Sequence, residues 1–267
     1  MSSDNKLKKI VKDKYAEIAV KGDENCCGTT SCCGTSEITD YSVFNDGYSK
    51  LNGYVAEADL SLGCGLPTEF AGIKEGDTVL DLGSGAGNDV FVARQIVGDD
   101  GKIIGLDFTE EMVNKAKKNN EKLGYHNVEF KLGDIEQMPI DGSSMDVIIS
   151  NCVLNLVPDK EKAFSEIYRT LKPGAHFCIS DVVIKGEMSE ELRKSAELYA
   201  GCVSGALDEN EYLKIIEQTG FNNIKICKSK KIEIPEHTLK LVLSEQGMKD
   251  YKNNLDGIFS ITVTADK

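Results

Sequence analysis

The sequence predicts an α/β protein built on a doubly wound, mainly parallel sheet. Three observations lead to this fold class. Short apolar runs alternate with amphipathic segments, a glycine-rich loop joins the first of these runs to the segment after it, and acidic residues stand at the ends of the next two runs. Apolar runs of this length are typical of buried strands, and the segments between them are typical of crossover helices.

Seven apolar runs are predicted to be strands, and the last two close the sheet. In chain order they are Thr78–Leu82, Lys102–Leu106, Val128–Lys131, Met145–Ile149, His176–Ser180, Ile224–Cys227 and Ile258–Val263. Helices are predicted over Asn88–Ile96, after Thr109, and over Lys160–Leu171, Glu190–Gly201 and Glu209–Thr219. We expect Thr109 to cap its helix, with Met112 and Ala116 on the buried side, and Pro173-Gly174 to stop the third helix.

The chain divides into two parts. Residues 1–40 are predicted to form a cap, which consists of an amphipathic helix over Lys6–Ala19 and a small, polar, cysteine-rich segment over Asp23–Ser36. Residues 41–267 are predicted to form one α/β domain, with a ligand-binding core over about 73–207 and a C-terminal part that completes the sheet.

Charge and hydropathy exclude several classes of partner. Lys plus Arg number 31 and Asp plus Glu number 44, so the net charge is −13. An acidic chain lacks the positive surface that nucleic acid or an anionic membrane requires. No apolar run is long enough to span a membrane, and residues 1–14 contain no apolar secretory segment, so we expect a cytoplasmic protein.

Nine cysteines are many for such a protein. In a reducing compartment they are not expected to form structural disulfides, which leaves thiolate chemistry, soft-metal binding and core packing. Cys178 and Cys227 lie within strand patterns and are predicted to be core residues.

The glycine-rich loop is the first candidate site. Gly83, Gly85 and Gly87 follow a strand and precede a helix, and glycines there allow a tight turn and close approach of a ligand. Asp81, just before them, could accept a cationic or amine-bearing group. The G-x-G-x-G spacing differs from the G-x-G-x-x-G of dinucleotide-binding proteins, although an NAD(P)-binding Rossmann domain is the alternative interpretation.

Acidic residues follow the next two strands. Asp107 stands 24 residues beyond Gly83 and could accept both hydroxyls of a ribose. Asp134 follows the third strand and could receive an adenine amino group, and simple turn residues are the alternative for each acid. Together, the loop and the two acids resemble the class I S-adenosylmethionine-dependent methyltransferases over Ile73–Lys267, which implies that fold and that cofactor.

Three other cysteines stand in distinctive motifs. Cys64 lies in Leu62-Gly-Cys-Gly-Leu-Pro67, Cys152 in Ser150-Asn-Cys-Val-Leu-Asn-Leu156, and Cys202 in Tyr199-Ala-Gly-Cys-Val-Ser-Gly205. They are 88 and 50 residues apart, so only folding can bring them together. On chemistry alone, each could equally be a buried, packed thiol.

These motifs resemble the arsenite methyltransferases. The resemblance runs from about Val43 to Leu207 and rests on four stretches: Gly63–Pro67, Asn151–Lys160, Leu171–Gly174 with Ser180-Asp181-Val182, and Gly201–Ala206. It implies that Cys64, Cys152 and Cys202 bind trivalent arsenic. It also implies that S-adenosylmethionine contacts Gly83, Gly85, Asp107, Met112, Asp134, Ile135 and Asn151. The position of Asp81 and Gly87 in the glycine-rich loop adds these two residues to the predicted cofactor contacts.

The resemblance implies a reaction in which arsenite becomes methylarsenite, with dimethylarsenite as a further product, and thiols are consumed. Glutathione or thioredoxin would then be the reductant. Arsenic(III) is soft and prefers thiolates, and its lone pair could attack the sulfonium methyl group in line. A tris-thiolate arsenic carries no proton, so no general base is needed, and none of His126, His176 and His237 stands in a catalytic setting.

The pairs Cys26-Cys27 and Cys32-Cys33 leave three interpretations open. The first is a structural zinc site, although the spacing of these cysteines does not match the C-x2-C pairs that are usual in such sites. Vicinal thiols could instead load a metalloid or exchange disulfides with the site, and the third interpretation is a segment with no catalytic duty.

Two other functions remain open from the sequence. One is methylation of a different small molecule, since this fold serves many acceptors; such an acceptor would need a base, and none is obvious. The other is metalloid binding without chemistry. The sequence also departs from the family in two ways. Ser61-Leu62-Gly63 lacks the aromatic residue that often precedes the first cysteine in relatives. Longer members continue into a further C-terminal domain, whereas this sequence stops soon after the last predicted strand.

Overall fold

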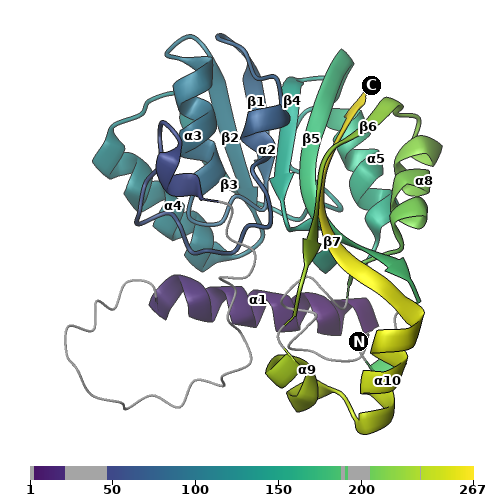
Figure 1. The fold of residues 1–267 in the computed structure, drawn as a ribbon. Helices are drawn as coiled ribbons and strands as arrows, with labels where there is room; N and C mark the ends of the chain where they lie inside the picture. The colour runs from purple at the N-terminus through teal and green to yellow at the C-terminus, as the bar shows by residue number, and fades with distance from the viewer. Residues whose placement is uncertain (1–2, 22–46, 188–189, 192–204, 235) are drawn as a thin grey trace.

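The computed structural model describes residues 3–21, 47–187, 190–191, 205–234 and 236–267 (Figure 1). Its centre is a seven-stranded sheet in the order β3-β2-β1-β4-β5-β7-β6. The strands are β1 (Thr78–Leu82), β2 (Lys102–Asp107), β3 (Val128–Leu132), β4 (Met145–Asn151), β5 (Leu171–Gly186), β6 (Asn222–Ile232) and β7 (Leu255–Asp266). Strands β1 to β5 pair in parallel, whereas β7 inserts antiparallel between β5 and β6. The predicted fold class is confirmed.

Helices lie on both faces of this sheet and beyond the ends of its strands (Figure 1). They are α1 (Ser3–Lys21), α2 (Pro67–Phe70), α3 (Asn88–Val97), α4 (Glu110–Leu123), α5 (Lys160–Thr170), α8 (Glu209–Thr219), α9 (Glu236–Val242) and α10 (Glu245–Asn254). Alternate residues of each strand point to opposite faces. Val79 accordingly packs in a cluster with α2, α3 and α4, whereas its neighbour Leu80 packs in a second cluster with α5 and α8.

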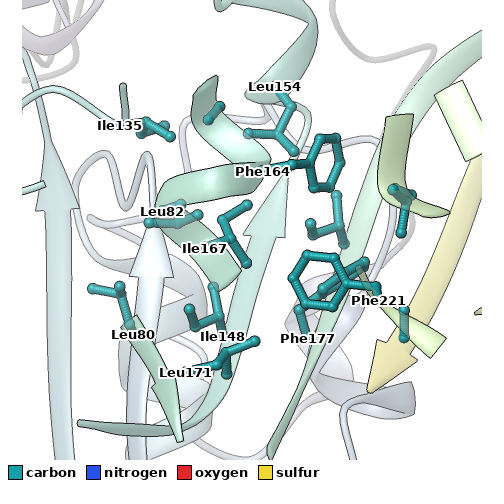
Figure 2. Packing of buried hydrophobic residues seen from close by; sticks show 14 of the residues in the cluster. Leu80, Leu82, Ile135, Ile148, Leu154, Phe164, Ile167, Leu171, Phe177 and Phe221 are labelled. Atoms are coloured by element: carbon teal, nitrogen blue, oxygen red, sulfur yellow. The ribbon is translucent and has the colours of Figure 1, made fainter. Parts of the chain in front are cut away.

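Aromatic rings fill the cluster on the α5 and α8 side (Figure 2). The Phe177 and Phe221 rings meet edge to face with centroids 4.8 Å apart, and Phe164 lies 6.0 Å from Phe177. Such ring pairs add about 0.5–1.5 kcal/mol each beyond the apolar area that they bury. This packing anchors β4 and β5, which carry one side of the site described below.

Most predicted elements are present, and three details are wrong. Helix α5 ends at Thr170 and β5 begins at Leu171, so Pro173-Gly174 lies inside a strand and does not stop the helix. Thr109 occupies the N-cap position of α4, but its side chain does not cap the helix. Cys227 is only half-buried on the edge strand β6, whereas Cys178 is fully buried as predicted.

The remaining differences concern the ends of the chain. The predicted helix over Lys6–Ala19 is α1, and it is longer at both ends. Helices α9 and α10 were not predicted. The predicted helix over Glu190–Gly201 lies almost wholly outside the described residues. Among the residues that are described, no helix is long and apolar enough to cross a membrane.

Candidate functional site

A pocket opens where β1, β2 and β4 end. Its walls come from four places: the glycine-rich loop after β1, the ends of the neighbouring strands, the segment before Cys64, and helix α1. The carboxyl ends of parallel strands are where open α/β sheets bind ligands. This position is therefore the expected one for a cofactor site.

Three glycines form the loop beside the floor of the pocket; Gly83 and Gly85 line the pocket, whereas Gly87 does not. Gly83, Gly85 and Gly87 all have positive φ angles, of 68°, 52° and 101°, which side chains rarely tolerate. A Cβ at Gly83 would collide with the side chain of Val153, whereas a Cβ at Gly85 would meet no atom within 4 Å. The backbone at Gly85 thus faces open space that a ligand can fill.

Three buried carboxyl groups line this floor. Asp81 is 2% exposed, and Asp89 and Asp107 are each 7% exposed. Burial raises the pKa of Asp81 well above its usual value, and the charges of Asp89 and Asp107 raise it further. Burial also raises the pKa of Asp89 to about 6, against the opposing effect of hydrogen bonds from Asn151 and Tyr48. Because like charges crowd here, a cationic ligand group would be strongly favoured.

Asp107 ends β2 and is held by backbone donors. Its Oδ2 accepts the Gly85 N–H at 3.0 Å, and its Oδ1 accepts the Thr109 N–H at 2.8 Å. A carboxylate has about four acceptor positions, so both oxygens can still accept ligand hydroxyls. Met112, Asp134 and Ile135 also line the pocket, as the sequence predicts for a bound cofactor.

The side-chain amide of Asn151 is hydrogen-bonded to other residues of the protein. Its Oδ1 accepts the Cys64 N–H at 3.0 Å, and its Nδ2 donates to the Gly65 carbonyl at 2.9 Å and to Asp89 at 3.1 Å. Tyr48, which is also buried, bonds to Asp89 at 2.8 Å and contacts the same amide. This network ties the loop that carries Cys64 to the end of β4.

Cys64 and Cys152 belong to one buried cluster. They are 2% and 5% exposed, and they share this cluster with Ala206, Val182 and other apolar residues. Cys152 lines the pocket and has a left-handed φ of 61°, with its N–H bonded to the Ser180 carbonyl at 2.7 Å. Cys202, like Cys26, Cys27, Cys32 and Cys33, lies outside the described residues.

Helix α1 forms the remaining wall. Val11 and Tyr15 line the pocket, and the Lys8 ammonium lies 2.6 Å from Asp134 Oδ2 and 2.7 Å from Glu136 Oε2. Burial lowers the pKa of Lys8, but the hydrogen bonds and charges of the two carboxylates outweigh this effect and raise it overall. The predicted adenine acceptor Asp134 therefore already has a charged partner.

Sequence reasoning missed several lining residues. Ser84 Oγ and Asn88 Oδ1 are buried and have no hydrogen-bond partner among the described residues, and both residues line the pocket. Asn88 and Asp89 directly follow the glycines, so their position was an available signal. Tyr48 and Lys8 carried no such signal, because only the fold brings them to the pocket.

The described part of the chain offers no metal site of an ordinary kind and no histidine at the pocket. No group of three or more His, Cys, Asp or Glu residues there could hold a metal ion. His176 contacts the Ala71 carbonyl at 2.5 Å through its Nε2 and does not line the pocket.

Comparisons with known proteins agree with this geometry. A family model described as "Methyltransferase domain" matches residues 73–220. An arsenite methyltransferase of Halobacterium salinarum is 40% identical over 82% of this chain and 58% of its own length, and the human arsenite methyltransferase is 37% identical over 68% and 51%. The chain thus spans between half and three fifths of these curated relatives.

Solved structures show the same relationship. An arsenic(III) S-adenosylmethionine methyltransferase from Chlamydomonas reinhardtii is 32% identical, with a TM-score of 0.68, over 84% of this chain and 73% of that one. A phosphoethanolamine N-methyltransferase from Haemonchus contortus, solved with S-adenosylmethionine, has a TM-score of 0.60 over 87% of this chain and 58% of that one. At 19% identity, the second likeness shows the fold alone.

Proposed function

This chain belongs to the arsenite methyltransferase family within the methyltransferase-domain proteins, and from that premise we propose that it methylates trivalent arsenic with S-adenosylmethionine. The observation that carries the proposal is the pairing of two buried thiols with an acid-lined pocket. Cys64 and Cys152 share one cluster, and Cys152 also lines the pocket. A soft substrate and a cationic cofactor could therefore meet at Cys152.

The pocket residues fit S-adenosylmethionine. Ser84 and Asn88 supply buried polar atoms that still lack partners, and the Gly85 backbone faces open space. Asp107 would hold the ribose hydroxyls, and Asp134 would hold the adenine beside Met112 and Ile135, as in the family. Asp81, together with Asp89, would attract the positive end of the cofactor. When bound, this cofactor supplies a methyl group on a sulfonium, which an arsenic lone pair can accept.

Cys64, Cys152 and Cys202 would hold the arsenic. Thiolates are the preferred ligands of soft ions, and three of them would replace the hydroxyls of arsenite. Ala206, four residues beyond Cys202, packs in the same cluster as the other two thiols, which supports Cys202 as the third ligand. The apolar side chains around them would exclude water from the reacting centre. When the arsenic lone pair forms a bond to the methyl carbon, arsenic would become formally pentavalent, and two thiols that join as a disulfide would supply the two electrons that return it to the trivalent state. We propose methylarsenite as the first product and dimethylarsenite as a further one.

No general base is required by this chemistry, in keeping with a pocket that no described histidine lines. The thiols must stay reduced, so we propose glutathione or thioredoxin as the reductant and a reducing compartment such as the cytoplasm as the setting. For Cys26, Cys27, Cys32 and Cys33 we retain the proposal that they load the metalloid or exchange disulfides with the site.

A matched pair of cysteine variants tests the proposal. We expect Cys152→Ser to lower methylarsenic formation at least about 100-fold, because an alcohol cannot replace a thiolate on arsenic. Its affinity for S-adenosylmethionine should stay within about threefold of wild type. Cys227→Ser is the control, since Cys227 is half-buried on β6 and does not line the pocket.

The assay contains reduced protein, S-adenosylmethionine, arsenite and thiol, and products are separated by chromatography and detected by elemental mass spectrometry. A wild-type rate in Cys152→Ser would refute the thiolate site. If the wild-type protein binds the cofactor but forms no methylarsenic, the acceptor is a different small molecule.

A further inference from the structure

Helix α1 lies across the ends of the strands that carry the pocket (Figure 1). Three of its side chains, Lys8, Val11 and Tyr15, form one wall of the pocket. Each of these residues is about one helical turn from the next, so all three lie on a single face of α1, and this face is turned to the pocket. The pocket is therefore complete only when α1 is docked.

Helix α1 buries few of its described side chains completely. Among its described side chains only Val11 and Ala19 are fully buried, at 1% and 3% exposure. Near its C-terminal end, the Lys115 ammonium donates to the Ala19 carbonyl at 3.3 Å. Near its N-terminal end, Lys8 bridges two carboxylates. Elements that bury few of their side chains completely can open locally while the rest of a protein stays folded.

The Lys8 bridge to Asp134 and Glu136 lies at one end of the pocket. Asp134 and Ile135 line the edge of the pocket at which we place the adenine, and Glu136 follows them in sequence and shares the Lys8 ammonium with Asp134. Their side chains are partly exposed, at 43% for Asp134 and 12% for Glu136, and Lys8 itself is 26% exposed. A partly exposed ion pair is weak enough to break often and is screened by salt.

We propose that α1 is a lid on the cofactor site, that the Lys8 bridge to Asp134 and Glu136 is its latch, and that cofactor and product exchange only when this latch is open. The proposal rests on the assignment of the pocket to S-adenosylmethionine. It assigns to Lys8 a kinetic role, since a latch that closes the free and the bound pocket alike slows entry and exit equally. The affinity for the ligand then depends little on Lys8.

The test compares Lys8→Met with Lys9→Met, which removes the neighbouring, exposed charge from the same helix. The probe is tritiated S-adenosylhomocysteine, whose association and dissociation are followed by rapid filtration with an unlabelled chase. For Lys8→Met we expect both rate constants to rise about 5- to 10-fold and the Kd to stay within about twofold. Lys9→Met should match wild type, and about 0.5 M salt should bring wild type close to Lys8→Met.

Equal rates in Lys8→Met and wild type would overturn the lid. Faster dissociation alone, with a proportional loss of affinity, would also overturn it, because Lys8 would then be a ligand contact. A wild-type protein that does not bind the probe would instead refute the cofactor assignment. Hydrogen exchange of the α1 amides gives a second readout: exchange should be faster in Lys8→Met, while the urea midpoint of the whole protein stays unchanged.

Discussion

The two halves of the site are built in different ways. The cofactor half is centred on one continuous stretch from β1 to α3, and residues at or just after the ends of β2, β3 and β4 join it. The thiol half is apolar and collects residues from distant parts of the chain, including Val11, Cys64, Cys152, Leu239 and Ile258. Backbone conformation therefore controls the first half, whereas long-range packing controls the second.

The largest expected effect is on the backbone of the cofactor half. Gly83→Ala places a methyl group against Val153 at a φ of 68°. We expect it to weaken S-adenosylmethionine binding at least about 30-fold and to lower the free energy of unfolding by about 2–4 kcal/mol. Gly85→Ala meets open space, so its cost in stability should be only about 1 kcal/mol. Calorimetric titration and urea denaturation measure both effects, and equal stability losses would contradict this account of the loop.

The next effect tests packing in the thiol half. Leu239 on α9 is 3% exposed and lies in the cluster with both thiols. Leu239→Ala should lower the free energy of unfolding by about 2–3 kcal/mol through the cavity that it leaves. We expect arsenite affinity to fall about tenfold while cofactor affinity is unchanged, and Val20→Ala, at a 58% exposed position, to change neither by a measurable amount. Loss of cofactor affinity in Leu239→Ala would show that the two halves are not independent.

The smallest effect concerns Asp181, a buried acid on β5 next to Val182 of the thiol cluster. Burial raises the pKa of Asp181 to about 7, although the Val182 N–H and the Lys160 charge oppose this rise. The folded state thus holds this proton more tightly than the unfolded chain does. The resulting stability is complete below about pH 4 and is lost as the pH rises through 7.

Asp181→Asn removes that titration while its carbonyl can still accept the Val182 N–H bond. We expect the variant to exceed wild type by about 1–2 kcal/mol at pH 8 and to match it near pH 4. Urea titrations at the two pH values check this. A variant that is less stable than wild type at pH 8 would mean that Asp181 is charged and stabilising in the folded protein.

The difference between the halves also explains what could be predicted. Strand β1, helix α8 and the glycine loop follow from local pattern, since an apolar run, a helical period or a glycine cluster fixes each one. Asp107 follows from its place at a strand end. All of these signals lie within a few residues of the feature that they predict.

The rest of the site depends on contacts that no local pattern contains. The Lys8 bridge joins residues 126 and 128 positions apart, and Tyr48 reaches Asp89 across 41. Asn151 was predicted as a cofactor contact, but its amide also binds the Cys64 loop from 87 positions away. Cys227 fits a strand pattern, yet its exposure depends on β6 being the sheet edge, which only the topology shows.

The insertion of β7 between β5 and β6 has a consequence for protein synthesis. Ser260 of β7 donates to the Cys64 carbonyl across 196 positions, and Ile258 packs beside both thiols. A ribosome adds about 5–20 residues per second, so roughly 5–20 s separate the synthesis of Cys152 from that of Ile258. For that interval the nascent chain carries both thiols without the strand that will bury them. We therefore expect both thiols to be open to oxidants and soft metals until β7 has been synthesised.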